Sequence, residues 1–325
     1  MQNQKIIIEL DDNKIKKVLK IKDVIKTVED GFRKKGLGLV SLSPKMGPKL
    51  GNGGEFADSM PVSVFNSSVG RVARPDLQVF GIKWLSGFPN NLKINIPYLN
   101  SLIVLNEPKC GRPTAILSGN WITAIRTAGV SAVCAKYLAP KKKSPTIGIF
   151  GLGIQAYIHV LAFKAIFRNA QFFLYEHDKK FLSDFLKRFP NEKFLTSKNH
   201  HEVVKNSDII LSATTFPKKI SPYIFGTDLK DDVLILPIDY GTRIDSKLYN
   251  LLDEIYTDDI PQYTSKSKLK QYFSSNRPSI KKEIGEIIAK KYKRGNKSKR
   301  ILVFNLGIAL FDILTGKLYI EKLKG

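Results

Sequence analysis

A glycine-rich turn in the middle of the chain limits the possible folds more than any other feature. In the stretch TIGIFGLGIQAYIHV, residues 146–160, the turn Gly-Leu-Gly at 151–153 joins a strand-like apolar run to a helix-like one. With Ala156 it fits G-x-G-x-x-A, where the glycines permit a tight turn and close approach of a pyrophosphate, and the small third residue permits helix–strand packing. The N–H groups at the start of the helix would bind the phosphates. The stretch therefore predicts a dinucleotide-binding unit.

An acidic residue lies where such a unit needs one. Glu176 ends the next strand-like run, FFLYE, close to the position at which a carboxylate holds the adenosine ribose. A carboxylate would repel the 2′-phosphate of NADP, so Glu176 favours NAD. The neighbouring His177, Lys179 and Lys180 leave NADP open. The alternative, an ordinary structural turn in an α/β sheet, also stays open at this point.

Strand-like and helix-like segments alternate in the second part of the chain. A helix is expected over 120–139, followed by strands and helices in turn. The expected strands are 146–150, 171–175, 208–214 and 232–238, with a further strand inside 252–259, and the expected helices are 153–168 and 179–188. This alternation predicts an α/β fold with a parallel, doubly wound sheet.

The first third of the chain is instead β-rich. Strand-like runs lie at 5–10, 60–65, 78–85, 101–105 and 114–118. One early helix is expected over 23–35, with Asp23 as its N-cap, because apolar residues recur there at helical spacing.

Composition bounds the class of protein. The 325 residues, of which 43% are hydrophobic, suffice for two domains with large cores. Two cysteines, Cys110 and Cys134, are too few for a disulfide framework and lack metal-site spacing, which favours a reducing, cytoplasmic setting without a bound metal. The N-terminus lacks a signal-peptide pattern and no apolar run reaches membrane-spanning length, so no membrane partner is expected.

The formal net charge of +24 raises the question of a nucleic-acid partner. The lysines are scattered, with local clusters at 141–143 and 290–300. No zinc-finger spacing, RNP-type aromatic motif or long basic tail accompanies them, so a lysine-rich surface is the better interpretation. The alternative, DNA binding driven by charge, predicts strongly salt-dependent affinity.

Four charged residues outside the glycine turn are candidates for chemistry. Lys83 lies in the apolar run VFGIKWL, and Arg126 lies on the otherwise apolar helix WITAIRTAG. Asp239 ends the run DVLILPID, and ligands of α/β sheets bind outside the carboxyl ends of the strands. Lys45 lies in the loop LSPKMGPK.

Each candidate also has a purely structural interpretation. Lys83 can be an inward lysine on an edge strand, and Arg126 a cap or a partner in an ion pair. Asp239 can begin a turn before Gly241, and Lys45 can be one more solvated lysine. The sequence alone does not show whether these side chains meet.

Blocks of sequence on both sides of the glycine turn resemble a known family. They are GIKWLSGFPNN, GRPTAILSGNWITAIRTAGVSAVCAKYLAP, IGIFGLGIQA, SDIILSATT, LPIDYGTRID and NLGIALFDI, in one order over roughly residues 40–315. Together they resemble the ornithine cyclodeaminase/mu-crystallin family. The resemblance implies a homodimer of two-domain subunits, with a Rossmann domain over 121–300. Residues 1–120 with 301–325 would form an α+β substrate and dimerisation domain.

The resemblance also implies roles for single residues. Lys83 and Asp239 would be catalytic, and Arg126 would bind the substrate carboxylate with Lys45, which stands at or near a family arginine. A lysine is a point charge rather than a bidentate fork, and Asn-Leu-Gly at 305–307 stands where the family has Ser-Thr-Gly. These departures suggest a subgroup whose substrate differs from ornithine. The cofactor-binding residues would be Thr127, Gly151, Gly153, Ile154, Gln155, Glu176 and Thr214.

The implied activity is NAD-dependent C–N chemistry on an amino acid through an imine, in its most specific form the conversion of ornithine to proline and ammonia. Alternatives in the same family are an alanine-type amino-acid dehydrogenase and a ketimine or imine reductase. An alternative of another class is a non-catalytic, mu-crystallin-like protein that binds NAD(P)H or a small ligand. The joint presence of Lys83, Arg126 and Asp239 favours an enzyme, since a pure binder need not keep all three.

Overall fold

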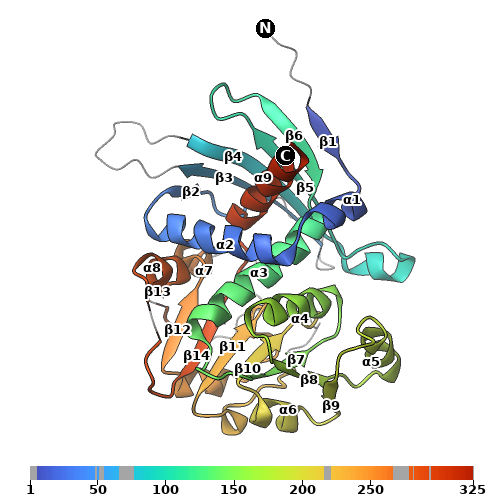
Figure 1. Cartoon of the computed structure of the whole chain (residues 1–325), viewed down its shortest axis with the longest axis vertical. Helices are drawn as coiled ribbons and strands as arrows, with labels where there is room; N and C mark the ends of the chain where they lie inside the picture. Colours follow the sequence, from blue (N-terminus) through green and yellow to red (C-terminus); the bar gives the residue numbers. More distant parts are fainter. Residues whose placement is uncertain are drawn as a thin grey trace. The chain divides into compact units, whose positions relative to one another are not determined.

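The chain divides into two compact units, Met1–Arg126 with Ile308–Gly325, and Thr127–Gly307. The computed structural model describes residues 6–47, 50, 55–65, 77–215, 221–265, 278–280, 282–292 and 294–324. Figure 1 shows one sheet in each unit, with helix α3 (Asn120–Leu138) carrying residues of both. The sequence predicts a domain boundary after residue 120, at the start of α3. The observed boundary lies further along this helix, between Arg126 and Thr127.

The sheet of the first unit has six strands in the order β1-β6-β5-β4-β3-β2. Strands β2 to β6 pair in antiparallel fashion, and β1 lies parallel to β6. Their bounds are β1 Ile7–Glu9, β2 Val40–Leu42, β3 Phe56–Phe65, β4 Leu77–Gly87, β5 Leu99–Asn106 and β6 Pro113–Ser118. Because successive side chains of a strand point to opposite faces, Val79, Gly81 and Lys83 of β4 share one buried face.

Three helices belong to the same unit: α1 (Asp12–Val18), α2 (Ile21–Gly36) and α9 (Leu310–Lys324). Helix α9 packs across β3, β4 and β5, and α2 packs against α9. A Cβ on Gly31 of α2 would lie 2.7 Å from Cδ1 of Leu314 and 3.2 Å from the Phe311 ring, so these side chains of α9 would have to shift to admit one. The expected N-cap at Asp23 is wrong. The helix begins after Lys20, and Asp23 lies in its first turn, where a carboxylate still favours the helix dipole.

The second unit is an eight-stranded, wholly parallel sheet in the order β13-β12-β14-β11-β10-β7-β8-β9. Its strands are β7 Thr146–Phe150, β8 Gln171–Tyr175, β9 Phe194–Ser197, β10 Ile209–Ser212, β11 Val233–Pro237, β12 Glu254–Thr257, β13 Lys282–Glu283 and β14 Arg300–Phe304. The expected α/β fold with a parallel sheet is confirmed.

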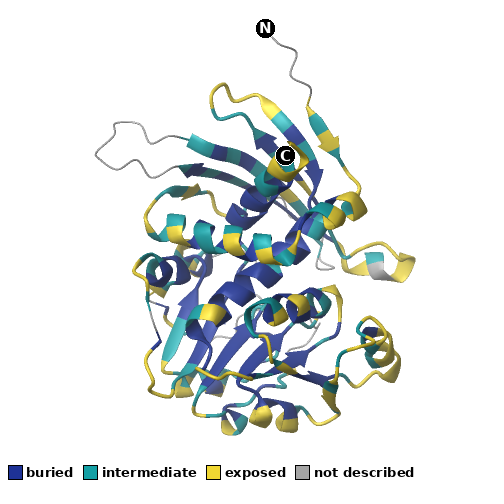
Figure 2. Ribbon diagram, viewed as in Figure 1, coloured by how far each residue is buried: buried dark blue, intermediate teal, exposed yellow. Residues whose placement is uncertain are grey.

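Helices connect these strands and cover the sheet. Besides α3 they are α4 (Ile154–Ile166), α5 (Lys179–Leu186), α6 (His200–Asn206), α7 (Ile260–Thr264) and α8 (Ile284–Ala289), with short 3₁₀ turns elsewhere. Figure 2 shows the central strands of this unit buried and the outer sides of its helices exposed. Parallel strands that are buried on both faces read as continuous apolar runs, as the sequence does here.

The apolar stretch 301–316 is not one element, which corrects the expectation that all of it returns to the first unit. Arg300–Phe304 forms β14 between β11 and β12 of the parallel sheet. The run RILVF is buried almost throughout and fits a central parallel strand. The chain turns at Gly307, whose φ is +79°, and only the residues from Ile308 onward belong to the first unit.

Four of the nine described basic residues in the two clusters form ion pairs. Lys142 contacts Asp208, and Arg294 contacts Asp232. The other pairs are Lys299 with Glu254 and Arg300 with Asp231. These contacts give the clusters a structural role within the second unit.

Candidate active site

The carboxyl ends of four neighbouring strands bring several predicted cofactor residues, and the predicted catalytic Asp239, to one edge of the parallel sheet. Phe150, the last residue of β7, is in register with Tyr175 of β8 on one side and Ser212 of β10 on the other. Ser212 is in turn in register with Pro237 of β11. The residues that follow these strand ends are Gly151, Glu176, Thr214 and Asp239. They therefore emerge side by side at the edge where α/β sheets bind ligands.

Gly151 is required by the backbone. Its φ is +83°, and a Cβ there would lie 2.8 Å from the carbonyl oxygen of Ala213 and 3.0 Å from Cα of Thr214. The left-handed conformation is costly for a residue with a side chain, and the contact leaves no room for one. The turn after β7 is thus as tight as the sequence predicts.

Gly153 is different, because no atom of the described residues other than its chain neighbours comes within 4 Å of the position of its missing Cβ. It is the N-cap of α4 and forms no side-chain cap, so the first N–H groups of this helix keep their hydrogen-bonding capacity. Ala156 is completely buried, Ile154 is half exposed, and Gln155 is half-buried. Open space over an uncapped helix N-terminus fits a phosphate group.

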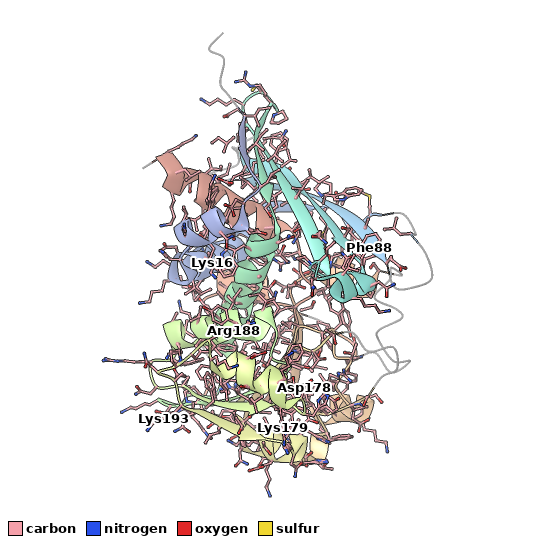
Figure 3. The ribbon with its side chains drawn as sticks, turned by 90° about the vertical axis from the view of Figure 1, so that its right-hand side faces the viewer. Lys16, Phe88, Asp178, Lys179, Arg188 and Lys193 are labelled. Atoms are coloured by element: carbon pink, nitrogen blue, oxygen red, sulfur yellow. The ribbon has the colours of Figure 1, made fainter. Side chains whose placement is uncertain are left out.

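Glu176 follows β8 and turns back onto its own loop. Its Oε1 accepts the N–H groups of His177 at 3.0 Å and of Asp178 at 3.1 Å. Asp178 caps α5, of which Lys179 is the first residue (Figure 3). Glu176 directly follows Tyr175, which is in register with Phe150 just before the glycine turn.

Asp239 is a buried carboxylate whose two oxygens have different surroundings. Oδ2 accepts hydrogen bonds from the hydroxyls of Ser212 and Thr214, the second at 2.8 Å. Oδ1 is buried and forms no hydrogen bond with any described residue. Burial raises the pKa of Asp239, although the Ser212 and Thr214 hydroxyls oppose the shift. A carboxylate with a raised pKa and an unsatisfied oxygen is suited to accept a proton or to bind an amine.

Two further residues extend the surroundings of Asp239. The Nε of Arg243 donates to the Thr214 hydroxyl at 3.0 Å, so Arg243 and Asp239 share Thr214. Tyr240, directly after Asp239, has a φ of +58°, which is uncommon for a residue with a side chain. Such local backbone strain is often found at functional sites.

In the first unit, Lys83 is completely buried on β4, the strand between β3 and β5. The interpretation of Lys83 as an edge-strand lysine is therefore wrong. Its Nζ donates to Asp312 Oδ1 at 2.6 Å and to the Thr123 hydroxyl at 2.7 Å. Burial lowers the pKa of Lys83 to about 8, with Arg126 adding to the shift and Asp312 opposing it. A lysine that titrates near neutral pH can act as an acid or a base.

Arg126 reaches the same carboxylate from α3. Its Nε lies 3.1 Å from Asp312 Oδ2, and its side chain is 7% exposed. Its two terminal nitrogens form no hydrogen bond within the described part of the chain. Burial alone would raise the pKa of Asp312, but Arg126 and Lys83 hold it below its ordinary value. With two cations and one anion, the cluster has an excess positive charge that suits a carboxylate ligand.

Lys45 lies in the segment before β3, where Met46 forms a bridge with Ser59. It is half-buried, and its positive charge is close enough to lower the pKa of Lys83 further. The structure thus brings Lys45, Lys83 and Arg126 together in the first unit. Of the predicted cofactor residues, Thr127 is half-buried on α3, one residue after Arg126.

Four of the residues at these sites are not among those singled out from the sequence: Thr123, Ser212, Arg243 and Asp312. Asp312 does carry a readable signal, a single charge within the apolar run LFDIL, which is the same signal that marks Lys83. Ser212 ends the buried apolar strand β10, where a small hydroxyl carries no functional signal, and Arg243 lies in the polar segment GTRIDS. Among the described residues, no group of three or more His, Cys, Asp or Glu side chains is arranged to hold a metal ion. In that same part of the chain, no helix has the length and apolar character needed to cross a membrane.

Comparison with known families decides the relationship of the chain. The sequence model of the ornithine cyclodeaminase/mu-crystallin family matches residues 8–325, nearly the whole chain. The chain belongs to this family. The expected resemblance is therefore confirmed.

Members of the family similar to this chain have different activities in their names. An ornithine cyclodeaminase of Brucella abortus is 33% identical over 141 residues, a match that spans 43% of this chain and 39% of that protein. A Δ(1)-pyrroline-2-carboxylate reductase of Bacillus thuringiensis is 28% identical over 263 residues, or 76% of this chain and 78% of that one.

A solved structure extends the likeness to the whole chain. The Thermococcus litoralis Δ(1)-pyrroline-2-carboxylate reductase, in complex with NADH and L-proline, superimposes with a TM-score of 0.82 at 25% identity, covering 98% of both chains. The family therefore includes nicotinamide-dependent enzymes that share this fold.

Proposed function

We propose that the chain is an NAD-dependent enzyme that oxidises or reduces the C–N bond of a small amino or imino acid. The observation that carries the proposal is the row of residues at one edge of the parallel sheet, where Gly151, Glu176, Thr214 and Asp239 follow strand ends in register. A turn that fits a pyrophosphate and a buried proton acceptor thus belong to one sheet edge. The NADH-bound relative of the same fold supports the choice of cofactor.

In this proposal the second unit holds the dinucleotide. The N–H groups at the start of α4 would bind the pyrophosphate over the open space at Gly153. Glu176 would hold the adenosine ribose, which favours NAD over NADP. When bound, NAD supplies the hydride acceptor or donor.

The first unit would bind the carboxylate of the substrate. The terminal nitrogens of Arg126 would form the main contact, and the excess positive charge of its cluster with Lys83 and Asp312 would stabilise the anion. Lys45 would add a further positive charge. Lys83 would exchange a proton near neutral pH, and Asp239 would accept a proton from the amine or from water.

The first candidate reaction is reduction of a cyclic imino acid, in which the imine, NADH and a proton give the amine and NAD⁺. It is supported by the reductase whose structure matches 98% of the chain. The second candidate is the conversion of ornithine to proline and ammonia, supported by the more identical but shorter match to a cyclodeaminase.

The test is an assay of the purified chain with three mixtures. Loss of NADH absorbance with Δ(1)-pyrroline-2-carboxylate, and formation of one proline per NADH, would support the reductase. Ammonia and proline from ornithine and NAD⁺ without net NADH would support the cyclodeaminase, and net NADH from alanine or proline a dehydrogenase.

A non-catalytic protein that binds NADH, as in mu-crystallin, is the remaining alternative. It predicts NADH binding by calorimetry and no turnover of any of these substrates. Absence of both binding and turnover would contradict the proposed function altogether.

We also propose a homodimer formed through the first unit. One face of its sheet carries a continuous apolar row across five strands, formed by Pro61, Ile82, Val104, Ile116 and Ile8 in register. The neighbouring pair, Trp84 and Leu102, is 49% and 42% exposed. A contiguous exposed apolar patch is typical of an interaction surface.

A cytoplasmic location remains part of the proposal. Cys110 is exposed and Cys134 is buried, and both are free thiols. An exposed free thiol fits a reducing compartment.

A further inference from the structure

The C-terminal helix contributes one charged side chain to the interior of the first unit. Asp312 of α9 is completely buried, although it is separated from Lys83 by 229 positions in the sequence. A carboxylate in such a position costs several kcal/mol of desolvation unless it is paired.

Each oxygen of Asp312 contacts a different cation. Oδ1 accepts from Lys83 Nζ at 2.6 Å, and Oδ2 lies 3.1 Å from Nε of Arg126. The Thr123 hydroxyl, which donates to the carbonyl of Gly119 at 2.6 Å, accepts a second hydrogen bond from Lys83. An ammonium has three N–H donors, so two of those of Lys83 are committed.

The same geometry sets which part of Arg126 is available. Because Asp312 contacts Nε, the two terminal nitrogens of the guanidinium keep the planar fork that suits a carboxylate. Without Asp312, nothing among the described residues would fix the rotation of the guanidinium. Two buried cations would also repel each other.

We propose that Asp312 is a positioning residue, which orients Arg126 and Lys83 and leaves the cluster with a single excess positive charge for the carboxylate of the substrate. The proposal rests on the function proposed above. Asp312 itself contacts neither substrate nor cofactor in this arrangement, and acts through its two partners.

The charges around Lys83 make the proposal testable by pH. The groups that face it are Asp312 on α9, Arg126 on α3 and Lys45 before β3. With Asp312 in place the pKa of Lys83 is about 8. Above that pH the cluster loses its excess charge, so KM for the substrate should rise. Removal of the Asp312 charge removes the contribution that raises the pKa, so the rise in KM should begin at a lower pH.

The experiment compares Asp312→Asn, Asp312→Glu and the control Thr315→Val with the wild-type chain. Thr315 is also completely buried on α9, and its hydroxyl forms no hydrogen bond to described residues. KM and kcat are measured over pH 6 to 10 for Δ(1)-pyrroline-2-carboxylate with NADH, and for whichever mixture the wild type turns over. The NADH dissociation constant is measured in parallel.

For Asp312→Asn we expect KM at neutral pH to rise at least tenfold, with a smaller change in kcat. The pH at which KM begins to rise should also be lower in this variant than in the wild type. Asp312→Glu keeps the charge, so its KM should rise without a change in that pH. Thr315→Val should match the wild type, and all variants should bind NADH as the wild type does. In the double variant with both Lys83→Met and Asp312→Asn, the fold-increase in KM should be smaller than the product of the fold-increases in the two single variants.

An unchanged KM and pH profile in Asp312→Asn would overturn the proposal. If Asp312→Asn does not fold, a KM and pH profile in Asp312→Glu equal to those of the wild type would do the same. Equal losses in all variants, Thr315→Val included, would reduce Asp312 to a structural residue. A wild-type chain that turns over no substrate contradicts the proposed function instead, which separates the two failures.

Discussion

Asp239 and Asp312 are both buried carboxylates, but their partners differ in charge. Neutral hydroxyls hold one oxygen of Asp239, and its pKa is raised by burial. Two cations hold Asp312, and its pKa is lowered despite burial. A carboxylate paired with cations is a poor base, whereas one that is buried among neutral donors gains protons readily. We therefore assign proton transfer to Asp239 and a positioning role to Asp312.

At the scale of single residues, Asp239→Asn should lower kcat and raise the free energy of unfolding. Loss of a general base should lower kcat roughly 10²- to 10⁴-fold. Removing a buried charge with an unsatisfied oxygen should raise the free energy of unfolding by about 1 kcal/mol, or roughly 2–4 °C in Tm.

The raised pKa gives the sign of the pH effect. The native state binds the proton of Asp239 more tightly than the unfolded state, so this group contributes stability at low pH and loses it as pH rises through its native pKa. The gain in Tm of Asp239→Asn should therefore be larger at pH 8 than at pH 4, by calorimetry. A variant with full kcat would contradict the role given to Asp239.

At the scale of elements, the strand–turn–helix unit β7–α4 contains two glycines with opposite constraints. Gly151 has a left-handed backbone and no room for a Cβ, while Gly153 has a φ of −78° and a Cβ position that the described residues leave open. The first glycine serves the fold, and the second leaves room for a ligand.

This contrast predicts different outcomes for two matched substitutions. Gly153→Ala should keep Tm within about 1 °C or raise it, because alanine adopts this backbone without strain, but should weaken NADH binding at least tenfold. Gly151→Ala should lower Tm by several degrees, since about 1–3 kcal/mol of backbone strain is added. Melting curves and NADH titrations check both. Unchanged NADH affinity in Gly153→Ala would exclude a phosphate over the turn.

A buried histidine of α4, His159, contacts α3. His159 contacts the Ser131 hydroxyl at 2.9 Å and the Gln155 carbonyl at 2.7 Å. Burial lowers its pKa from 6.5 to about 4, so the native state keeps this ring neutral.

The neutral ring predicts acid sensitivity of the second unit. Between pH 6.5 and 4 the unfolded state binds a proton that the native state does not. The free energy of unfolding therefore decreases as the pH is lowered over this range, by about 3 kcal/mol at most. In His159→Gln, which keeps polar contacts without a titrating group, the free energy of unfolding should fall less over the same range. Denaturant titrations at several pH values measure it, and equal losses in both proteins would exclude His159 as the cause.

At the scale of the whole molecule, the apolar outer face of the first unit's sheet determines the assembly we expect. Leu102 and Trp84 are in register on this face and are exposed in the single chain. Their burial by a second copy would remove apolar surface from water, which favours association.

Leu102→Lys should therefore convert a dimer into a monomer. The substitution places a charge in the proposed interface, whereas NADH affinity should not change, because the residues proposed for NADH belong to the other unit. Light scattering after size-exclusion chromatography measures the mass. Lys93→Glu, at an exposed lysine of the same unit, is a matched control for altered charge. A wild-type chain that runs as a monomer at all concentrations would exclude the dimer.

The sequence by itself determined the features that depend on local periodicity and local backbone geometry. The tight turn at Gly151, the alternation of strands and helices after it, and the unusual charges at Lys83, Arg126 and Asp239 were all readable from neighbouring residues. These patterns predict a parallel α/β sheet and its candidate ligand-binding edge, because strand period, helix period and turn chemistry are short-range properties. The same reading assigns the stretch 301–316 to one domain, since hydrophobic runs alone do not show which sheet a strand joins.

Only the tertiary structure decided which charges balance one another. Asp312 reaches Lys83 across 229 positions, and the hydroxyls of Ser212 and Thr214 reach Asp239 from a neighbouring strand. The energy of a buried charge depends on the partners that folding brings within a few ångströms of it, and no local pattern encodes those partners. The protonation behaviour of Lys83 and Asp239, and with it the chemistry we propose, is therefore a property of the folded chain.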